Sequence, residues 1–419
     1  MMPVSRLVPI PAPAKWAMLA LVGAWLVWRI VFLGMANLES TRKNDPEAAL
    51  GWYSSLPGAH RKIGVRDLEA RPENALRHLR AAVDGNPVES RNYAALGQLL
   101  EKGGADDLAR KAMETAAKLA PQRSDVQLDL TAYWARQGNF PRALQHWNTV
   151  LRHQPALRQR LFPYLLNGAE DPANLPAFKS LLSRPVPWWT EFFVHAATHA
   201  TRPETVRALY ELTHEGANEL PPEAFGAYLA RLQKEGSWTE AWFVWLNSLS
   251  RQELGQSAYV FNGSFERRPT NIGFDWIYQK TPAVVMDTTS TYGTTGERAL
   301  NLVFRGVRVK FEHLYQYLLL PPGTYFLQGR ARPDNLKAAQ GMQWALYCLG
   351  ERVPLTVSER FTGQDQWTRF RSQFTVPAGC PVQMLRLELA GKIALDYDVS
   401  GGIWFDDIAV EQAGRGFGG

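Results

Sequence analysis

Cysteine is scarce in this sequence, and the common catalytic motifs are absent. Cys348 and Cys380 are its two cysteines among 419 residues, and they do not form a Cys-x-x-Cys pair. A zinc site built on paired cysteines is therefore not expected. The sequence has no phosphate-binding loop, no dinucleotide glycine fingerprint and no Gly-x-Ser-x-Gly turn. We therefore expect a protein that is not an enzyme and that requires no cofactor.

Long runs of one charge sign are also missing. The 46 basic residues narrowly outnumber the 40 acidic ones and are spread along the chain. Without a basic run or an RNA-binding signature, no nucleic-acid partner is expected. His195 and His199 are four residues apart, but Ala196 stands where a zinc protease carries its catalytic glutamate. We therefore expect the side chains of these histidines to pack between helices.

A hydrophobic run near the N-terminus predicts a membrane anchor. Residues 16–36 (WAMLALVGAWLVWRIVFLGMA) number about 21 and carry one charge, Arg29. This length is sufficient to cross a bilayer. Arg6 and Lys15 precede the run, which favours a cytoplasmic segment 1–15 and export of the rest. The sequence thus predicts an inner-membrane protein with the bulk of its chain in the periplasm.

A cleavable signal peptide is the competing interpretation of this run. Gly34 and Ala36 provide the small residues that a cleavage site needs. An uncleaved anchor fits better, because the apolar stretch is long and is interrupted by Arg29. Both interpretations predict that the remaining chain is exported.

Three prolines mark an internal repeat. Pro87, Pro121 and Pro155 stand 34 residues apart, the length of one helix–turn–helix unit of a tetratricopeptide array. In such units a small residue lets two helices approach closely, and proline ends the second helix. The residues that recur in step are Ala75, Leu79 and Ala82; Tyr93, Leu96, Gly97, Leu100, Ala109, Met113 and Ala116; and Leu130, Trp134, Gly138, Ala143, Trp147 and Val150.

The repeat pattern predicts a tetratricopeptide-like superhelix over residues 45–250. The pattern weakens at 156–187, where five prolines interrupt it, and returns with Ala208 and Ala241, which are 33 residues apart. Arrays of this kind usually bind other proteins. We therefore expect a groove that holds a protein partner.

After about residue 257 the sequence changes to short alternating runs cut by Gly, Pro and Asn. This sequence pattern is typical of an all-β sandwich. The length of the region, residues 257–412, fits a jelly-roll domain. Both cysteines lie here, so an exported chain permits a Cys348–Cys380 disulfide; two small buried residues are the alternative. The Gly-rich tail at 413–419 is expected to be disordered. The predicted strands are 258–261, 274–278, 299–304, 315–320, 323–332, 342–348, 367–376, 384–389 and 402–410.

The two ends of this region resemble a known family. Val260–Glu266 (VFNGSFE) and Ile403–Ile408 (IWFDDI) resemble the first and last strands of the galactose-binding-like jelly rolls of carbohydrate-binding modules. The LPPGTY and WTRFR segments between them are typical of the same modules. The whole chain resembles membrane-anchored tetratricopeptide proteins of polysaccharide-producing bacteria. This resemblance implies a role close to a glycan.

The resemblance also implies a structural calcium site, because the first and last strands of such modules lie side by side and often carry carboxylates. Glu266 with Asp406 or Asp407 are the candidates, since calcium takes six to eight oxygen ligands. In the alternative, Glu266 pairs with Arg267 or Arg268, and the aspartates cap a strand end.

Sugar binding needs exposed aromatic faces beside polar groups that fix orientation. Trp276 and Tyr278 stand two apart in a predicted strand and therefore share a face. With Asp275 and Gln279 they are the leading candidates for a ligand face. Further aromatic residues available for sugar binding, most of which we expect to be core, are Tyr292, Tyr317, Trp344, Trp367 and Trp404.

These features together predict a non-enzymatic periplasmic scaffold or adaptor for assembly or export of a cell-envelope polysaccharide, either exopolysaccharide or O-antigen. Its repeat groove would hold a protein partner, and its sandwich would contact glycan or protein. One alternative is an adaptor with no sugar affinity. Another is an envelope glycan-active enzyme, which would have to use acids such as Asp365, Asp396 and Asp398.

Overall fold

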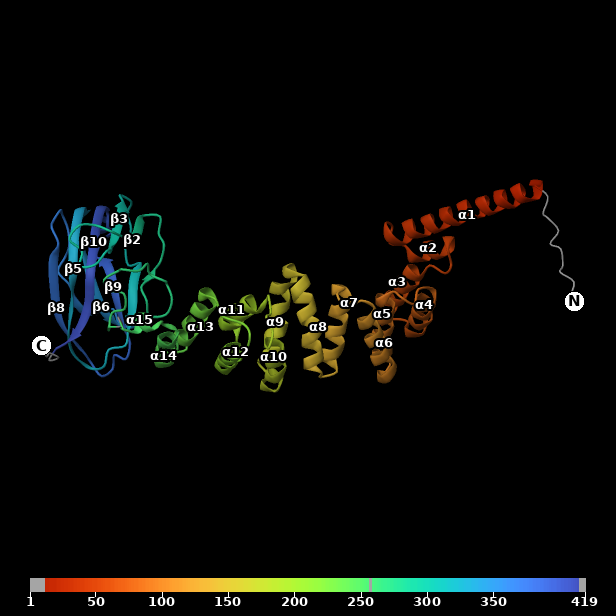
Figure 1. Cartoon of the computed structure of the whole chain (residues 1–419), viewed down its shortest axis with the longest axis horizontal. Helices are drawn as coiled ribbons and strands as arrows, with labels where there is room; N and C mark the ends of the chain where they lie inside the picture. Colours follow the sequence, from red (N-terminus) through yellow and green to blue (C-terminus); the bar gives the residue numbers. More distant parts are fainter. Residues whose placement is uncertain (1–11, 256–257, 414–419) are drawn as a thin grey trace, which may run out of the picture. The chain divides into compact units, whose positions relative to one another are not determined.

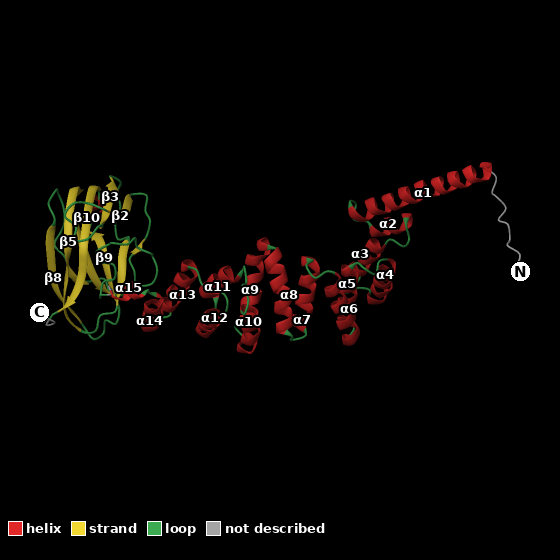
Figure 2. Ribbon diagram, viewed as in Figure 1, coloured by secondary structure: helices red, strands yellow, loops and turns green. Residues whose placement is uncertain are grey.

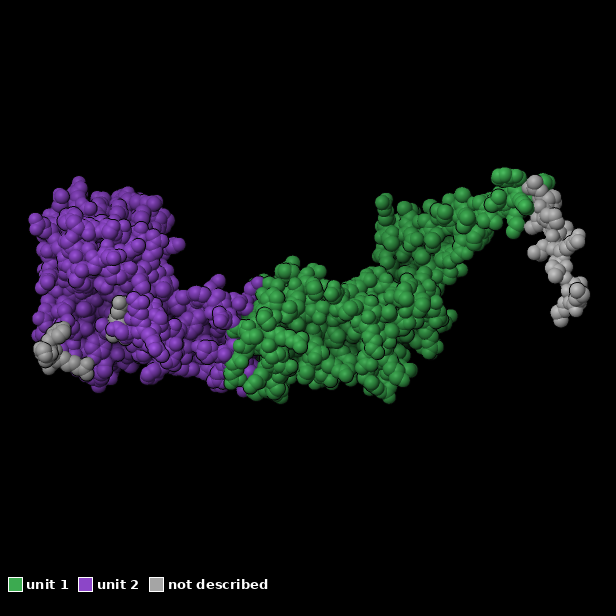
Figure 3. Space-filling view, viewed as in Figure 1, with its two compact units in different colours: residues 1–189, 215–218 green, residues 190–214, 219–419 purple. Residues whose placement is uncertain are grey.

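The computed structural model describes residues 12–255 and 258–413. Most of the predicted cytoplasmic segment and the predicted tail from residue 414 onward lie outside these residues. Helices make up the N-terminal part of the chain and strands the C-terminal part (Figure 2). The chain forms two compact units, residues 1–189 with 215–218 and residues 190–214 with 219–419 (Figure 3).

Fifteen α-helices lie within residues 12–255 (Figure 1). Two short 3-10 turns, at Pro155–Leu157 and Pro172–Asn174, interrupt them in the proline-rich stretch. The helices are α1 (Ala12–Thr41), α2 (Pro46–Trp52), α3 (Pro57–Arg66), α4 (Pro72–Gly85), α5 (Ser90–Lys102), α6 (Asp106–Leu119), α7 (Ser124–Arg136), α8 (Phe140–His153), α9 (Arg158–Ala169), α10 (Leu175–Leu182), α11 (Trp189–His199), α12 (Pro203–Glu215), α13 (Pro222–Lys234), α14 (Trp238–Ser248) and α15 (Arg251–Gly255).

Helix α1 contains the predicted membrane segment. Its residues 15–41 are long and apolar enough to cross a membrane. The helix continues beyond residue 36, and Ala36 is buried there against Ala49 of α2 and the following Leu56. Arg29 donates from Nη2 to the hydroxyl of Tyr53 over 3.2 Å. The C-terminal turns of α1 therefore pack on the first residues of the helical region.

The predicted repeat appears as successive helix pairs, α3 with α4, α5 with α6, and α7 with α8. The second helices of these pairs begin at Pro72, Asp106 and Phe140, which are 34 residues apart. The turns before α6 and α8 contain Gly104 and Gly138, with φ of 72° and 66°. Glycine adopts this left-handed conformation without strain. The same short turn thus recurs with the period of the sequence.

Packing inside the helix pairs follows the predicted small and large positions. Ala75, Ala109 and Ala143 are fully buried, and a Cβ added at Gly97 would lie 3.0 Å from the side chain of Met113. Each small residue therefore marks a close helix–helix approach. Exposed ion pairs such as Lys102–Glu69 (2.7 Å) link successive pairs but contribute less than about 1 kcal/mol each.

The C-terminal region is a sandwich of two five-stranded antiparallel sheets. The first sheet has the order β1-β4-β9-β6-β7, and the second has the order β2-β3-β10-β5-β8. Strands β3, β4, β5 and β6 fall alternately in the two sheets, as in a jelly roll. The strands are β1 (Ile277–Tyr278), β2 (Val284–Thr289), β3 (Ala299–Arg305), β4 (Leu314–Leu318), β5 (Gly323–Ala338), β6 (Met342–Cys348), β7 (Pro354–Val357), β8 (Thr368–Val376), β9 (Gln383–Leu389) and β10 (Val399–Gln412).

One predicted strand is wrong, and two strands were not predicted. Residues 258–261 form no strand, and the side chain of Gln316 satisfies the backbone of Phe261. Its Oε1 accepts from Phe261 N and its Nε2 donates to Phe261 O, both over 2.9 Å. Strands β2 and β7 lie in segments for which no strand was predicted from the sequence. The predicted Cys348–Cys380 disulfide is confirmed, and Cys380 lies in the sandwich core.

Candidate functional site

The predicted ligand face around Trp276 is wrong. Trp276 is 0% exposed and belongs to the core of the sandwich, with its ring 5.2 Å from Phe265 and 5.3 Å from Trp344 between centroids. A sugar cannot stack on a ring that is covered on all sides. Trp276 also lies just before β1 (Ile277–Tyr278), because the predicted strand 274–278 forms only at its last two residues, so strand alternation does not place Trp276 and Tyr278 on one face.

The companions of Trp276 also have structural partners. Asp275 is buried and its carboxylate accepts from the backbone of Thr270 and of Trp276, over 2.9 and 2.7 Å. Burial raises the pKa of this carboxyl group. Tyr278 donates its hydroxyl to the carbonyl of Val284 over 3.0 Å, and Gln279 is exposed. Trp276, Asp275 and Tyr278 therefore hold the start of the sandwich together.

Aromatic rings gather instead on the outer face of the second sheet, which is the face turned away from the core. Trp404 of β10 lies directly opposite Arg332 of β5. The guanidinium carbon of Arg332 lies 4.0 Å from the ring centroid of Tyr292, 5.1 Å from that of Trp404 and 5.5 Å from that of Trp367. We call Tyr292, Arg332, Trp367 and Trp404 the aromatic–arginine cluster.

Strand alternation places this cluster outside the core. Ile403 and Phe405 belong to the core cluster of the sandwich, so Trp404 between them points the other way. Ala331 of β5 is likewise core, and Arg332 follows it on the outer side. Strands β5 and β10 are neighbours in the sheet (Figure 1), so their outward residues meet.

The loop between β2 and β3 completes the cluster. Trp367 donates from Nε1 to the carbonyl of Tyr292 over 2.8 Å, and Arg332 donates from Nη2 to the hydroxyl of Thr291 over 2.8 Å. Tyr292 is 72% exposed, whereas Arg332 beside it is 5% exposed. One face of the Tyr292 ring therefore covers the arginine, and the ring also presents a large surface to solvent.

Two polar donors of the cluster have no hydrogen-bond partner. Among the residues that the structure describes, five buried side-chain atoms lack one, and Arg332 Nε and Trp404 Nε1 are two of these. Buried polar groups are almost always satisfied, and an unsatisfied donor costs about 1–3 kcal/mol. Both donors belong to the opposed pair Arg332 and Trp404, and both lie beneath the surface of the cluster in this structure.

A second arginine holds the loop against the sheet. Arg330 lies 3.8 Å from Asp406 and 3.6 Å from Asp407, between Nη1 and a carboxylate oxygen. Its Nη1 also donates to the hydroxyl of Thr295 over 2.6 Å, and Asp406 accepts from Thr295 N over 3.0 Å. Burial raises the pKa of Asp406. Arg330 thus has its own counter-ions, whereas Arg332 has three rings.

The predicted calcium ligands contact the same loop. Glu266 accepts from the backbone of Glu297 and Arg298, over 3.1 and 3.3 Å, while Asp406 and Asp407 contact Thr295. Within residues 12–255 and 258–413, no three His, Cys, Asp or Glu side chains gather as metal ligands. Because N–H donors and Arg330 already face these oxygens, the residues do not fit a calcium cage. Calcium binding stays a prediction without support from this geometry.

The acids of the enzyme alternative have separate partners. Asp398 pairs with Arg308 over 2.8 Å, and this hydrogen bond lowers the pKa of the carboxyl group. Asp396 accepts from the backbone N–H groups of Lys392 and Ile393, which lower its pKa. Asp365 accepts from the N–H of Gln366. Because their pKa values are lowered, the carboxyl groups of Asp396 and Asp398 are poor general acids.

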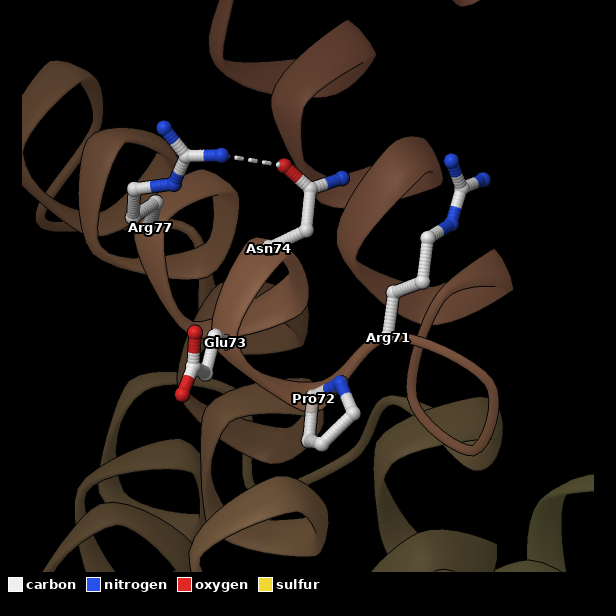
Figure 4. A pocket seen from close by; sticks show the side chains of 5 residues that line it. All are labelled: Arg71, Pro72, Glu73, Asn74 and Arg77. Atoms are coloured by element: carbon white, nitrogen blue, oxygen red, sulfur yellow. Dashed lines mark hydrogen bonds between the residues drawn. The ribbon is translucent and has the colours of Figure 1, made fainter.

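Hollows open on the surface of unit 1 at two places among its described residues. One, of about 570 Å³, lies at the start of α4 and is lined by Arg71, Pro72, Glu73, Asn74 and Arg77 (Figure 4). Its polar groups are engaged with one another, since Arg77 donates to Asn74 over 2.9 Å, and both Asn74 and Arg71 donate to Asp67. It is an open polar surface with no unpaired buried group among its residues.

The other hollow, of about 300 Å³, lies between helix pairs. Its apolar surface comes from α4, α5 and α6, and the exposed cations Arg80 and Lys111 stand among its lining residues. No ion pair of either cation occurs among the described residues. The apolar residues that line the hollow are Leu76, Tyr93, Leu96, Leu100, Leu108 and Ala112.

No protein-family model matches the chain, and no curated protein matches it. Several solved structures are similar to it. One is described as "CBM4 structure and function" (15% identity, covering 36% of this chain and 99% of that chain, TM-score 0.28). Two others are a family 16 carbohydrate-binding module and TmCBM61 in complex with β-1,4-galactotriose. For each of these the identity is 18%, the match covers 37% of this chain and 99% of that chain, and the TM-score is 0.26.

Proposed function

We propose that this chain is a membrane-anchored, non-enzymatic adaptor whose sandwich binds glycan at the aromatic–arginine cluster and whose helix pairs bind a protein partner. It serves the assembly or export of a cell-envelope polysaccharide such as exopolysaccharide or O-antigen. One observation carries the glycan part: Tyr292, Trp367 and Trp404 surround Arg332 on the outer face of a sheet. Pyranose C–H groups pack on aromatic faces, and guanidinium and indole N–H groups donate to sugar oxygens.

The glycan proposal is tested with the full chain in detergent. We expect affinity gel electrophoresis with a panel of envelope polysaccharides to show retardation. We expect Tyr292→Ala to weaken binding by about two- to tenfold, because a ring contact is worth roughly 0.5–1.5 kcal/mol. Tyr164→Ala is the matched control, since Tyr164 is 65% exposed on α9, far along the chain from the sandwich. Retardation by none of the polymers would instead favour an adaptor with no sugar affinity.

Helix α1 supplies the proposed anchor. Its apolar residues 15–41 are expected to resist alkaline extraction from membranes, and removal of residues 1–43 is expected to release the chain. A reporter fused after Ser250 is expected to be active in the periplasm. Recovery of the intact chain in the soluble fraction, or reporter activity confined to the cytoplasm, would contradict the proposed topology.

We interpret the helix pairs as a tetratricopeptide-like superhelix whose partner binds at the hollow of α4, α5 and α6. The apolar lining and the cations Arg80 and Lys111 fit a segment that carries an acidic residue beside an aliphatic one. Each charge pair at such a rim is worth up to about 1 kcal/mol. We therefore expect Arg80→Glu with Lys111→Glu to abolish capture of a partner that the wild-type chain retains.

The control for this charge reversal is Lys118→Glu, on the same α6 helix but outside the hollow. This variant replaces one positive charge by a negative one, and we expect it to capture the partner as well as the wild type does. Equal capture by the double variant and the wild type would show that the partner binds elsewhere.

A further inference from the structure

We propose that the glycan held by the sandwich is an acidic polysaccharide, whose anionic groups bind beside the aromatic–arginine cluster. This inference rests on the proposed function and names the ligand class of the same site. It follows from the charges on the outer face of the second sheet, from the burial of Arg332 and from the position of the exposed rings.

The outer face of β5 and β8 is rich in arginine. Arg332 lies on β5, and Arg369 and Arg371 lie on β8, at alternate positions that point away from the core residue Phe370. Arg330 is opposite Arg369 in the register of the two strands. Among the described residues, Arg330 has carboxylate partners and the other three have none within 4.0 Å. The face therefore carries three positive charges without counter-ions.

Arg332 is the least usual of these arginines. A charged group that is 5% exposed normally has an ionic partner, because leaving water without one is costly. Here the guanidinium has three aromatic rings, one hydroxyl and an unpartnered Nε. A buried charge is poorly screened by solvent and salt. The charge of Arg332 therefore acts on the surface outside Tyr292 with little screening, even though Arg332 itself is covered.

Exposed groups next to this buried charge can contact a ligand directly. Tyr292 offers its ring to solvent, and Trp367 is partly exposed beside it. Arg369 follows Trp367 by two residues and is exposed on the same side of the strand. A pyranose stacked on these rings therefore has a guanidinium fork within reach of its substituents. Arginine binds carboxylate and other oxyanions through two parallel N–H donors.

An acidic sugar satisfies both parts of this surface. Its C–H face packs on the rings, and its carboxylate or sulfate accepts from the arginines. A neutral sugar would use the rings alone and would leave the three unpaired charges without a counter-ion. A polymer also carries a charge on each repeating unit, so that neighbouring units can bind Arg369 and Arg371, which lie two residues apart on β8.

The test measures binding of the full chain in detergent to four polymers at low and high salt. The polymers are polygalacturonate, dextran sulfate, neutral dextran and duplex DNA. We expect the wild type to bind polygalacturonate or dextran sulfate at least tenfold more tightly than dextran, and 0.5 M NaCl to weaken this binding about tenfold. The stronger of the two acidic polymers identifies the anion as carboxylate or sulfate.

Arg369→Gln is the decisive variant, because its side chain is exposed and its loss should not disturb folding. It is expected to weaken acidic-polymer binding about tenfold and to leave binding of neutral dextran unchanged. Arg352→Gln removes the same charge from an exposed position between β6 and β7 of the first sheet, and it is expected to bind like the wild type.

The possible failures are distinguishable. If neutral and acidic polymers bind equally, and Arg369→Gln does not affect their binding, this inference is overturned but the proposed glycan binding is not. Binding of DNA as tight as that of the acidic glycans would also overturn it, because the face would then recognise charge alone. Binding of none of the polysaccharides would overturn the proposed glycan function itself.

Discussion

Replacing Trp276 by alanine is expected to destabilise the sandwich by about 3–5 kcal/mol, the range for removing a buried tryptophan from a core. Its ring fills the space between Phe265 and Trp344, and its Nε1 donates to the carbonyl of Asn262 over 3.1 Å. The variant therefore loses packing and one hydrogen bond to the carbonyl of Asn262. Urea unfolding followed by tryptophan fluorescence measures the change in midpoint.

The matched variant in this experiment is Tyr292→Ala. Tyr292 is 72% exposed, and its loss removes mainly a cation–π contact worth about 0.5–1 kcal/mol. We expect its midpoint to stay close to that of the wild type. Together the two variants separate a structural aromatic residue from a ligand-binding one. A small loss for Trp276→Ala would contradict the assignment of this ring to the core.

Removing the Cys348–Cys380 disulfide is expected to cost about 3–4 kcal/mol, because the bond closes a loop of sequence separation 32 and so restricts the unfolded chain. The bond joins the end of β6 to the segment before β9, where Gln383 Nε2 donates to the carbonyl of Cys380. The measurement is urea unfolding of the Cys348→Ser, Cys380→Ser double variant.

Reductant provides the control for this second prediction. The wild type treated with dithiothreitol should unfold at the midpoint of the double variant, and the double variant should not respond to the reagent. Equal midpoints for the oxidised wild type and the double variant would show that the disulfide contributes no stability.

The helical repeat was predictable because its signal is both periodic and local. Proline, a left-handed glycine and a small buried residue recur every 34 residues, and each has a steric reason that needs no knowledge of distant contacts. Ala109 and Ala143 illustrate this, as both are fully buried at the predicted spacing. The fold class of the β-sandwich was predictable for a similar reason. The alternation of apolar and polar residues and the turn residues are also local features of the sequence.

The candidate site was not predictable in the same way. Trp276 lies just before β1 and Trp404 lies within β10, and only the packing of the core shows that one ring points inward and the other outward. Arg332 was not singled out, since an arginine in a strand is usually solvated. The alternation of arginine and apolar residues in β5 and β8 was the available signal. It indicates two neighbouring strands whose outer faces are basic.

The three proposed parts act together by proximity. An anchored chain that holds both a partner and a polymer raises the effective concentration of each for the other. Such tethering needs no catalytic residue. Fold alone does not establish this function, so it depends on binding at the aromatic–arginine cluster.

Hydroxyl-radical footprinting of the full chain, with and without an acidic polysaccharide, tests the central claim most directly. The reagent oxidises exposed aromatic side chains, and mass spectrometry reads each position. Bound polymer is expected to protect Tyr292 and Trp367 and to leave Tyr164 on α9 as reactive as before. Unchanged oxidation of Tyr292 under conditions where the polymer is bound would contradict the account.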